Sequence, residues 1–213
     1  IVNSNKSRTP VRGAHLKARI FGIDGSQKFA RDTVLDLPAD SSMRVFNLPE
    51  PTGLTANAAG NSAYFVDLRL TSSQGQSLSR NFYWLSTKSD VLSDSSTWYM
   101  TPTSSYADFT QLREMPPASV KANSTFTSVG GAGRASVTLT NTGSSIAFFI
   151  RLQITGSNGN EALPVTWSDN YGSLLPGETR VLTATYRVSE LGGAQPKLEY
   201  RGWNVHKRGT TIH

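Results

Sequence analysis

Short segments in which apolar and polar residues alternate recur along the whole chain. Between residues 16 and 20, leucine, alanine and isoleucine alternate with lysine and arginine, the period-two pattern of a half-buried strand. Similar short strands are expected at residues 34–37, 43–46, 64–70, 78–85, 120–126, 135–139, 147–154, 180–186 and 197–203. Turn residues separate them and no long amphipathic helix is present, which predicts an all-β sandwich architecture.

Two of these strands carry specific expectations about their faces. In the strand at 64–70 the apolar side chains share one face: Tyr64, Val66, Leu68 and Leu70. Asp67 and Arg69 occupy the other face and are expected to form a surface pair. In the strand at 78–85, Arg80 interrupts an apolar face that includes Trp84. We expect Trp84 in the core, because sandwiches often bury a tryptophan.

The two halves of the chain repeat one local pattern. The sequence IFGIDG at residues 20–25 is echoed by ITGSNG at residues 154–159, and each follows a strand that ends in asparagine and a hydroxyl residue. Asp24-Gly25 is expected to form a type I′ hairpin turn, which needs positive φ at both central positions. The echo predicts two tandem copies of one β-rich module.

The stretch between the copies differs in composition. It is rich in Ser, Thr and Asp, yet it carries Trp98, Tyr99, Tyr106, Phe109 and Leu112. A purely flexible linker does not need such side chains, so we expect a connector packed on one or both sandwiches. A helical turn capped by a serine is expected at 106–112 and should end before two prolines. The predicted boundaries are 1–97, 98–116 for the connector, and 117–213.

Composition and charge exclude several classes of protein and argue against others. The chain has 213 residues, a formal net charge of +6 and no cysteine, so disulfide scaffolds and thiolate metal sites are excluded. The charge is spread evenly, whereas nucleic-acid binding usually needs a basic stripe. The cluster His206-Lys207-Arg208 is expected to be a solvated tail. No apolar run reaches the ~20 residues of a membrane helix, and the start at Ile1 indicates a piece of a longer protein.

No segment has the pattern of an active site or a cofactor site. The three histidines, His15, His206 and His213, lie outside any nucleophile motif or metal-ligand spacing. The glycines at 130–133 lack the lysine and helix of a phosphate loop and predict a hairpin. The sequence at 169–171 predicts a turn held by Asp or Asn side chains. We therefore expect no catalytic residue, no cofactor and no metal.

The tryptophans are the remaining candidates, because aromatic faces stack on sugar rings. Trp98 and Tyr99 on the connector and Trp203 near the end of the chain are the candidate contacts, either with sugar or between domains. Packing between domains is the favoured interpretation for Trp98-Tyr99.

Several segments taken in order resemble the C-terminal immunoglobulin-like domains of family 2 glycoside hydrolases. The branch they resemble contains exo-β-D-glucosaminidase, mannosylglycoprotein endo-β-mannosidase and β-mannosidase. The segments are SRNFYWLSTK at 79–88, TWY at 97–99, TP at 101–102, YADF at 106–109, LPV at 163–165, SDNY at 168–171, SLLPGE at 173–178 and GWN at 202–204. The resemblance implies two tandem immunoglobulin-like sandwiches joined by a packed connector.

The resemblance also implies a parent enzyme whose catalytic TIM barrel is the main partner of these domains. Such a barrel needs about 250 residues of alternating strands and helices, which this chain lacks. The chain itself is therefore expected to be non-catalytic, while its parent hydrolyses β-linked glucosamine or mannose with retention. An oligosaccharide at the cleft edge is a second expected partner, no nucleic acid or membrane is expected, and the implied location is secreted or periplasmic.

Three other functions remain open on the sequence. An autonomous carbohydrate-binding module would use the exposed aromatic residues. An adhesion or scaffold protein would bind another protein through an apolar patch. An enzyme in its own right would need an active site that the sequence does not reveal.

Overall fold

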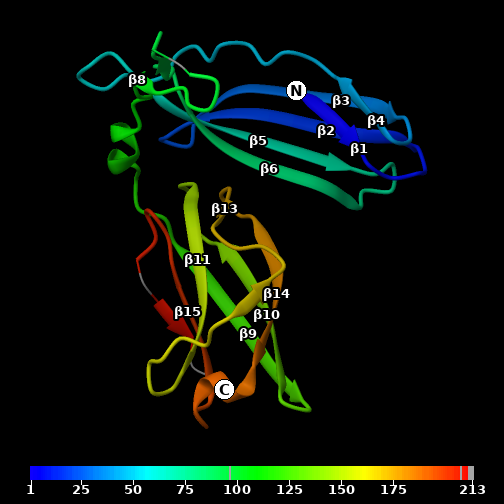
Figure 1. Ribbon diagram of the computed structural model, residues 1–213, viewed down its shortest axis with the longest axis vertical. Helices are drawn as coiled ribbons and strands as arrows, with labels where there is room; N and C mark the ends of the chain where they lie inside the picture. The colour runs from blue at the N-terminus through cyan, green and yellow to red at the C-terminus, as the bar shows by residue number, and fades with distance from the viewer. Residues whose placement is uncertain (96, 207, 211–213) are drawn as a thin grey trace. The chain divides into compact units, whose positions relative to one another are not determined.

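The computed structural model describes residues 1–95, 97–206 and 208–210, and it divides the chain into two compact units, Ile1–Met115 and Pro116–His213. Both units are built from antiparallel strands and contain only short 3₁₀ helices among the residues described (Figure 1). The two predicted modules are therefore present, and each is described by itself.

The first unit contains a four-stranded sheet in the order β3-β2-β5-β6 (Figure 1). Its strands are β2 (Val11–Gly22), β3 (Gln27–Leu37), β5 (Ala63–Thr71) and β6 (Ser77–Ser86). A two-stranded sheet of β1 (Val2–Asn5) and β4 (Ser41–Arg44) forms the second layer. The connector adds β7 (Val91–Leu92), β8 (Thr103–Ser105) and the 3₁₀ helix η1 (Thr110–Glu114).

The core of the first unit lies on one face of this sheet. The alternating apolar residues of β2 are buried as predicted, and cross-strand pairing places them beside their counterparts on β5, with Leu16 opposite Leu70. Phe46 and partly buried residues of the smaller layer, including Met43, cover them. The alternation in β2 therefore identified the core face correctly.

The prediction for Trp84 is wrong. Its side chain is 41% exposed and lies on the sheet face that points away from this core. Cross-strand pairing sets Trp84 beside Phe65, and Phe82 beside Asp67. Strand β6 lies at the edge of the sheet. The alternation of its side chains divides them between the two faces of the sheet, but it does not show which face is covered by the core.

The second unit is a sandwich of two four-stranded sheets. One has the order β12-β14-β10-β9 and the other β13-β11-β15-β16. The strands are β9 (Val120–Val129), β10 (Ala132–Asn141), β11 (Ala147–Gly156), β12 (Val165–Trp167), β13 (Gly172–Leu174), β14 (Thr179–Arg187), β15 (Pro196–Arg201) and β16 (Arg208–Thr210), with the 3₁₀ helix η2 (Val188–Leu191) after β14.

The interior of this sandwich is filled by side chains of both sheets. Val137 and Leu182 of one sheet pack with Ile150, Leu152 and Leu198 of the other. A second cluster, which includes an isoleucine at 154 and a tyrosine at 186, continues the core toward η2.

Gly133 on β10 makes room for the ring of Tyr186. A Cβ atom at this glycine would collide with the ring carbons of Tyr186, so any larger residue would displace the tyrosine. The two residues are cross-strand partners in the pairing of β10 with β14. The ring of Tyr186 can therefore lie over the backbone of β10 only because residue 133 has no side chain.

The echoed segments form the same turn in both units. In each, the first glycine and the glycine three residues later make a backbone hydrogen bond: Gly25 N to Gly22 O at 3.0 Å, and Gly159 N to Gly156 O at 2.9 Å. The carboxyl or amide oxygen between them accepts a backbone N–H, as Asp24 Oδ1 does from Ser26. The echo in the sequence is thereby explained by shared turn chemistry.

The turn type predicted at Asp24-Gly25 is wrong. Gly25 has φ +83° while Asp24 has no positive φ, so the turn is a type I turn followed by a left-handed glycine, not type I′. Two positive φ values occur instead at Gly130-Gly131, which join β9 to β10. The hairpin predicted for that glycine-rich segment is confirmed.

The end of the chain also departs from expectation. The strand expected at 197–203 is shorter in the structure: β15 ends at Arg201, before Trp203, and a further strand, β16, follows it. Arg208 begins β16 and pairs with Tyr200, so it does not belong to a solvated tail. Lys207 and His213 lie outside the described residues.

Candidate interaction surfaces

The connector forms a small antiparallel hairpin, which we call the aromatic hairpin (residues 90–95 and 97–106). Strands β7 and β8 pair Val91 with Ser105 and Leu92 with Thr103. At its base, the Asp90 carboxylate accepts a hydrogen bond from the Ala107 N–H at 2.7 Å. The N–H at position 93 donates to the carbonyl oxygen at position 102 at 2.8 Å. The hairpin is therefore held by hydrogen bonds at its base and along its length.

The tip of the aromatic hairpin presents Trp98, Tyr99 and Met100 to solvent. Thr97 and Met100 face each other across the turn, with N–H···O distances of 2.7 and 3.3 Å. Trp98 is 95% exposed and Tyr99 70% exposed. Their rings meet edge to face, with centroids 5.2 Å apart and planes at 78°. The two rings therefore pack on each other and not on the sandwich of their own unit.

The C-terminal part of the connector does pack on the first unit. Gln111 is buried, accepts a hydrogen bond from Ala63 N at 2.9 Å and donates one to Thr55 O at 2.7 Å. Leu112 and Met115 are buried beside it.

The predicted serine cap of this segment is wrong. The helix η1 begins at Thr110, and no side chain caps it from the preceding residue, Phe109. The N–H of Thr110 bonds to the carboxylate of Asp108 instead. The helical turn therefore starts later than the sequence pattern predicts, and an aspartate holds its first N–H.

Asp108 fastens this part of the connector to the loop before β5. Its Oδ1 accepts hydrogen bonds from the hydroxyl and N–H of Thr110, and its Oδ2 accepts from the side-chain amides of Asn57 and Asn61. The Thr110 hydroxyl is the largest of these influences, and together the donors hold the pKa of Asp108 well below its usual range. Every donor favours the charged carboxylate.

We expect the Asp108→Asn variant to be less stable than the wild type at neutral pH. Both oxygens of the Asp108 carboxylate accept hydrogen bonds, and the NH2 group of an asparagine in its place would face N–H or O–H donors instead of accepting from them. Since the folded-state pKa is lowered, the carboxylate stabilises the fold above the unfolded pKa of about 3.9. This contribution disappears as the pH falls through the lowered folded-state value. Urea midpoints measured from pH 7 to pH 2 should therefore converge at the acid end. Asp94→Asn is the control, and an equal loss in both variants would contradict the assignment.

Trp203 lies on a turn of the second unit and is about half exposed. Its backbone N–H donates to Phe148 O at 2.9 Å. The neighbouring Asn204 ties three segments together: its Nδ2 donates to Pro116 O and Ile146 O, both at 2.8 Å, and its Oδ1 accepts from Phe148 N at 2.9 Å. The backbone around Trp203 is thus fixed by the asparagine of the GWN segment.

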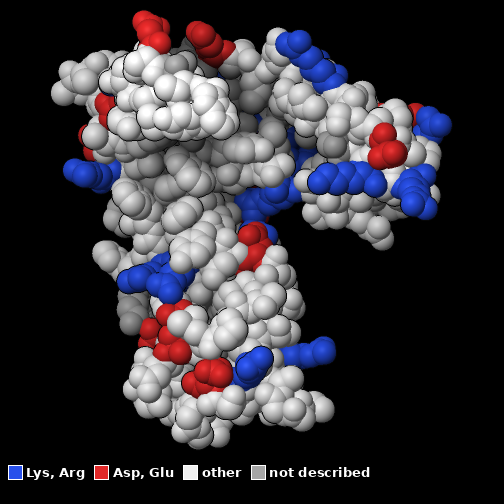
Figure 2. Space-filling view, viewed as in Figure 1, with Lys and Arg blue, Asp and Glu red and all other residues white. Residues whose placement is uncertain are grey.

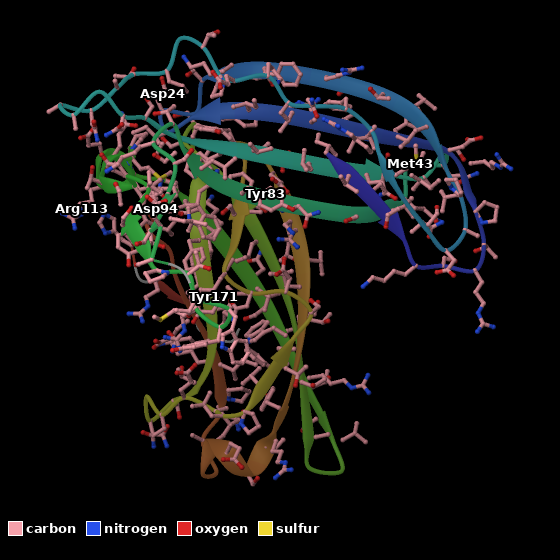
Figure 3. All side chains as sticks on the ribbon, turned by 45° about the horizontal axis from the view of Figure 1, so that its top comes forward. Asp24, Met43, Tyr83, Asp94, Arg113 and Tyr171 are labelled. Carbon is pink, nitrogen blue, oxygen red and sulfur yellow. The ribbon has the colours of Figure 1, made fainter. Side chains whose placement is uncertain are left out.

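Sequence reasoning missed an aromatic pair in the second unit. Phe149 and Tyr171 (the latter labelled in Figure 3) both have left-handed backbones, with φ +54° and +56°, and their ring centroids are 5.2 Å apart. A register shift in β11 lies between Ala147 and Ile150. No periodic pattern in the sequence signals this irregular site.

The turn predicted at 169–171 is confirmed. Asn170 Oδ1 accepts the N–H groups of Leu152 and Tyr171, at 2.8 and 2.9 Å, and its Nδ2 donates to Leu152 O at 3.0 Å. The asparagine therefore ties the turn to the middle of β11, as the Asp-Asn pattern predicts.

The expected pairing of Asp67 with Arg69 is confirmed, but its expected position on the surface is wrong. Asp67 is fully buried, and its Oδ2 receives a hydrogen bond from Arg69 Nε at 2.7 Å. A second guanidinium, that of Arg80, places its Nε 3.6 Å from Oδ1. The carboxylate is flanked on adjacent strands by Arg19 and Phe82. This group is an internal ion-pair site in which one carboxylate lies between two arginines.

A shallow groove of about 480 Å³ runs beside the edge strand β9 in the second unit. All of its lining residues are uncharged, and they include Phe126, Tyr186 and Gln195. Burial raises the pKa of Tyr186 above its ordinary value, so its phenol stays protonated at neutral pH.

The described residues contain no cluster of three or more potential metal ligands. His15 and His206 are both exposed and lie in different units, while His213 is outside the described residues. Among the described helices, none has the length and apolar character needed to cross a membrane. On the drawn face, basic and acidic side chains are scattered over each unit (Figure 2).

Two family models match the chain and together span most of it. The model of the exo-β-D-glucosaminidase Ig-fold domain matches residues 98–205, and the model of the mannosidase Ig/CBM-like domain matches residues 1–88. Both are models of immunoglobulin-type domains, in agreement with the two units of the fold.

Curated and solved relatives agree with these matches. An exo-β-D-glucosaminidase of Streptomyces avermitilis is 39% identical over 96% of this chain and 23% of its own length. Its counterpart in Amycolatopsis orientalis is 37% identical over 96% of this chain and 20% of its own length. The crystal structure of an exo-chitosanase from the latter organism superimposes with a TM-score of 0.90 at 33% identity, over 99% of this chain and 25% of that one. The chain thus spans about a quarter of these relatives and corresponds to their non-catalytic immunoglobulin-like portion.

Proposed function

Because the chain belongs to the family of exo-β-D-glucosaminidase Ig-fold domains, we propose that it is the C-terminal pair of accessory sandwiches of a family 2 glycoside hydrolase. The parent would hydrolyse β-linked glucosamine in chitosan-type oligosaccharides with retention. One observation carries the choice of sugar: the glucosaminidases align with 96% of the chain, whereas a mannosylglycoprotein endo-β-mannosidase aligns with only 33% of it. Hydrolysis of β-mannose in N-glycan cores is the second candidate.

In this proposal the two units act as rigid bodies that brace the catalytic barrel of the same polypeptide. Each unit has its own hydrophobic core, so each can hold a surface in place without help from the barrel. Trp98, Tyr99 and Trp203 are the proposed contacts, either with the barrel or with sugar at the edge of its cleft. A secreted or periplasmic location would give the parent access to polymeric substrates.

The other functions that the sequence left open gain no support from these relatives, which are glycoside hydrolases rather than separate binding modules or adhesion proteins. The accessory role assigns no reaction step to any side chain of this chain. Its contribution to the parent's activity would be structural: it would hold barrel loops in position and limit their motion.

Activity assays on two proteins test the proposal. The parent polypeptide is expected to release p-nitrophenol from PNP-β-D-glucosamine faster than from the corresponding β-mannoside. The 213-residue chain alone is expected to release none. Turnover by the isolated chain would overturn the accessory role, and faster release from the mannoside would overturn the choice of glucosamine.

A further inference from the structure

The aromatic hairpin exposes six large apolar side chains to solvent. Besides Trp98, Tyr99 and Met100, it exposes Val91, Leu92 and Tyr106, each by more than half. Its only charged residues are two aspartates, at position 90, where the carboxylate is bonded to a backbone N–H, and at position 94. A gathering of exposed apolar side chains on one small element is typical of an interaction site.

The described residues of the aromatic hairpin are held together by hydrogen bonds. Backbone bonds close the hairpin at Ser93–Pro102 and at Thr97–Met100, and Ser104 Oγ adds a bond to Val91 O at 3.0 Å. The packed segment that contains Gln111 follows directly in the chain. Little conformational entropy would therefore be lost when a partner covers the tip, which favours binding.

The composition of the patch favours a protein partner over a sugar. Sugars stack on flat aromatic faces and use polar groups for orientation, and one or two rings suffice for that. Val91, Leu92 and Met100 are aliphatic and offer no such face. Protein interfaces instead combine a tryptophan or tyrosine anchor with surrounding apolar contacts. Methionine is itself enriched in interface cores.

The size of the patch favours a partner on the same polypeptide. A tip of a few side chains is smaller than the roughly 1,200–2,000 Å² interfaces that hold separate proteins together. A covalent tether raises the effective concentration of the partner to about the millimolar range, so a small contact suffices. The chain spans only 20–25% of its relatives, and three quarters of such a polypeptide are available as the partner.

We infer that the aromatic hairpin docks into an apolar recess of the catalytic barrel in the same polypeptide. Trp98 is the anchor, and Tyr99 and Met100 surround it at the tip. The inference rests on the proposed function, because that function supplies the barrel.

Methionine oxidation by hydrogen peroxide tests the docking. The sequence has three methionines: Met100 is exposed at the tip, Met115 is 7% exposed, and Met43 is half-buried in β4. Oxidation follows exposure, so Met100 should become sulfoxide about tenfold more slowly in the parent than in the 213-residue chain. Met115 should react slowly in both and reports that the first unit stays folded. Peptide mass spectrometry reads each site.

Two variants of the parent complete the experiment. Trp98→Ala should return Met100 to the oxidation rate of the isolated chain while Met115 stays slow. Val34→Ala removes another exposed apolar side chain of the first unit and should leave Met100 protected. Protection that also disappears in Val34→Ala would contradict the specific role of Trp98.

Three results would overturn the inference. Equal oxidation of Met100 in the parent and in the isolated chain would mean that the tip stays free. Slow oxidation already in the isolated chain would mean that this chain covers its own tip. Protection in the parent only after a glucosamine oligomer is added would make the tip a saccharide contact. The oxidation readout does not depend on turnover, so failure of the proposed activity is distinguished from failure of the docking.

Discussion

Replacing Asp67 by alanine is expected to lower the free energy of unfolding of the first unit by about 3 kcal/mol, since breaking a buried ion pair leaves charge uncompensated in the interior. Asp67 is fully buried between the guanidinium groups of Arg69, at 2.7 Å, and Arg80, at 3.6 Å. Without the carboxylate, these two cations face each other in a partly desolvated site. Urea unfolding followed by tryptophan fluorescence measures the effect.

Two variants control this prediction. Asp32 lies 3.6 Å from Arg19, and its side chain is 59% exposed, so Asp32→Ala should cost less than about 1 kcal/mol, as exposed pairs do. Asp67→Asn keeps the size of the side chain and separates the loss of charge from the loss of volume. If Asp67→Ala and Asp32→Ala shift the unfolding midpoint equally, the buried carboxylate does not contribute as argued.

The second large effect is expected at Asn204. Asn204→Ala removes two donated hydrogen bonds and one accepted bond, all made to backbone groups of Pro116, Ile146 and Phe148. These backbone groups lie in partly buried surroundings, and each one left without a partner costs about 1–3 kcal/mol. We therefore expect a loss of about 3 kcal/mol in the second unit, measured by its urea unfolding transition.

The control for Asn204 is Asn123→Ala. Asn123 is exposed on β9, so its replacement should change stability by less than about 0.5 kcal/mol. Hydrogen exchange adds a local readout: the Phe148 amide should lose protection in Asn204→Ala and keep it in Asn123→Ala. Unchanged protection of Phe148 would show that the asparagine does not fix this segment.

Alternation along the strands predicts the fold better than it predicts burial. The residues that alternate in β2 pack in the core as expected, because β2 lies in the middle of its sheet. Strands β5 and β6 carry large side chains on both faces, and alternation alone does not rank one face above the other. For this reason the pattern assigns Trp84 to the core and Asp67 to the surface, the reverse of the observed burial.

For the candidate contact residues, too, the sequence predicts some features and not others. The aromatic residues of the Ser/Thr-rich stretch draw attention to Trp98 and Tyr99. Their exposure, however, depends on a hairpin closed by backbone bonds that no sequence pattern signals. The pair of Phe149 and Tyr171 depends on left-handed backbones at two residues other than glycine. Such conformations are imposed by the surrounding packing and are not encoded by local propensity.

The shared turns of the two units have a practical consequence for engineering. Gly22–Ser26, Ser72–Gln76 and Gly156–Asn160 each close with the same pair of backbone bonds inside five residues. Two of these bonds lie within each turn, but the turn at 156–160 is also tied to a distant segment by Ser157 N to Gln195 O at 3.0 Å. The turns at Gly22–Ser26 and Ser72–Gln76 are therefore the positions at which we expect a grafted epitope or ligand-binding loop to leave the strand register unchanged.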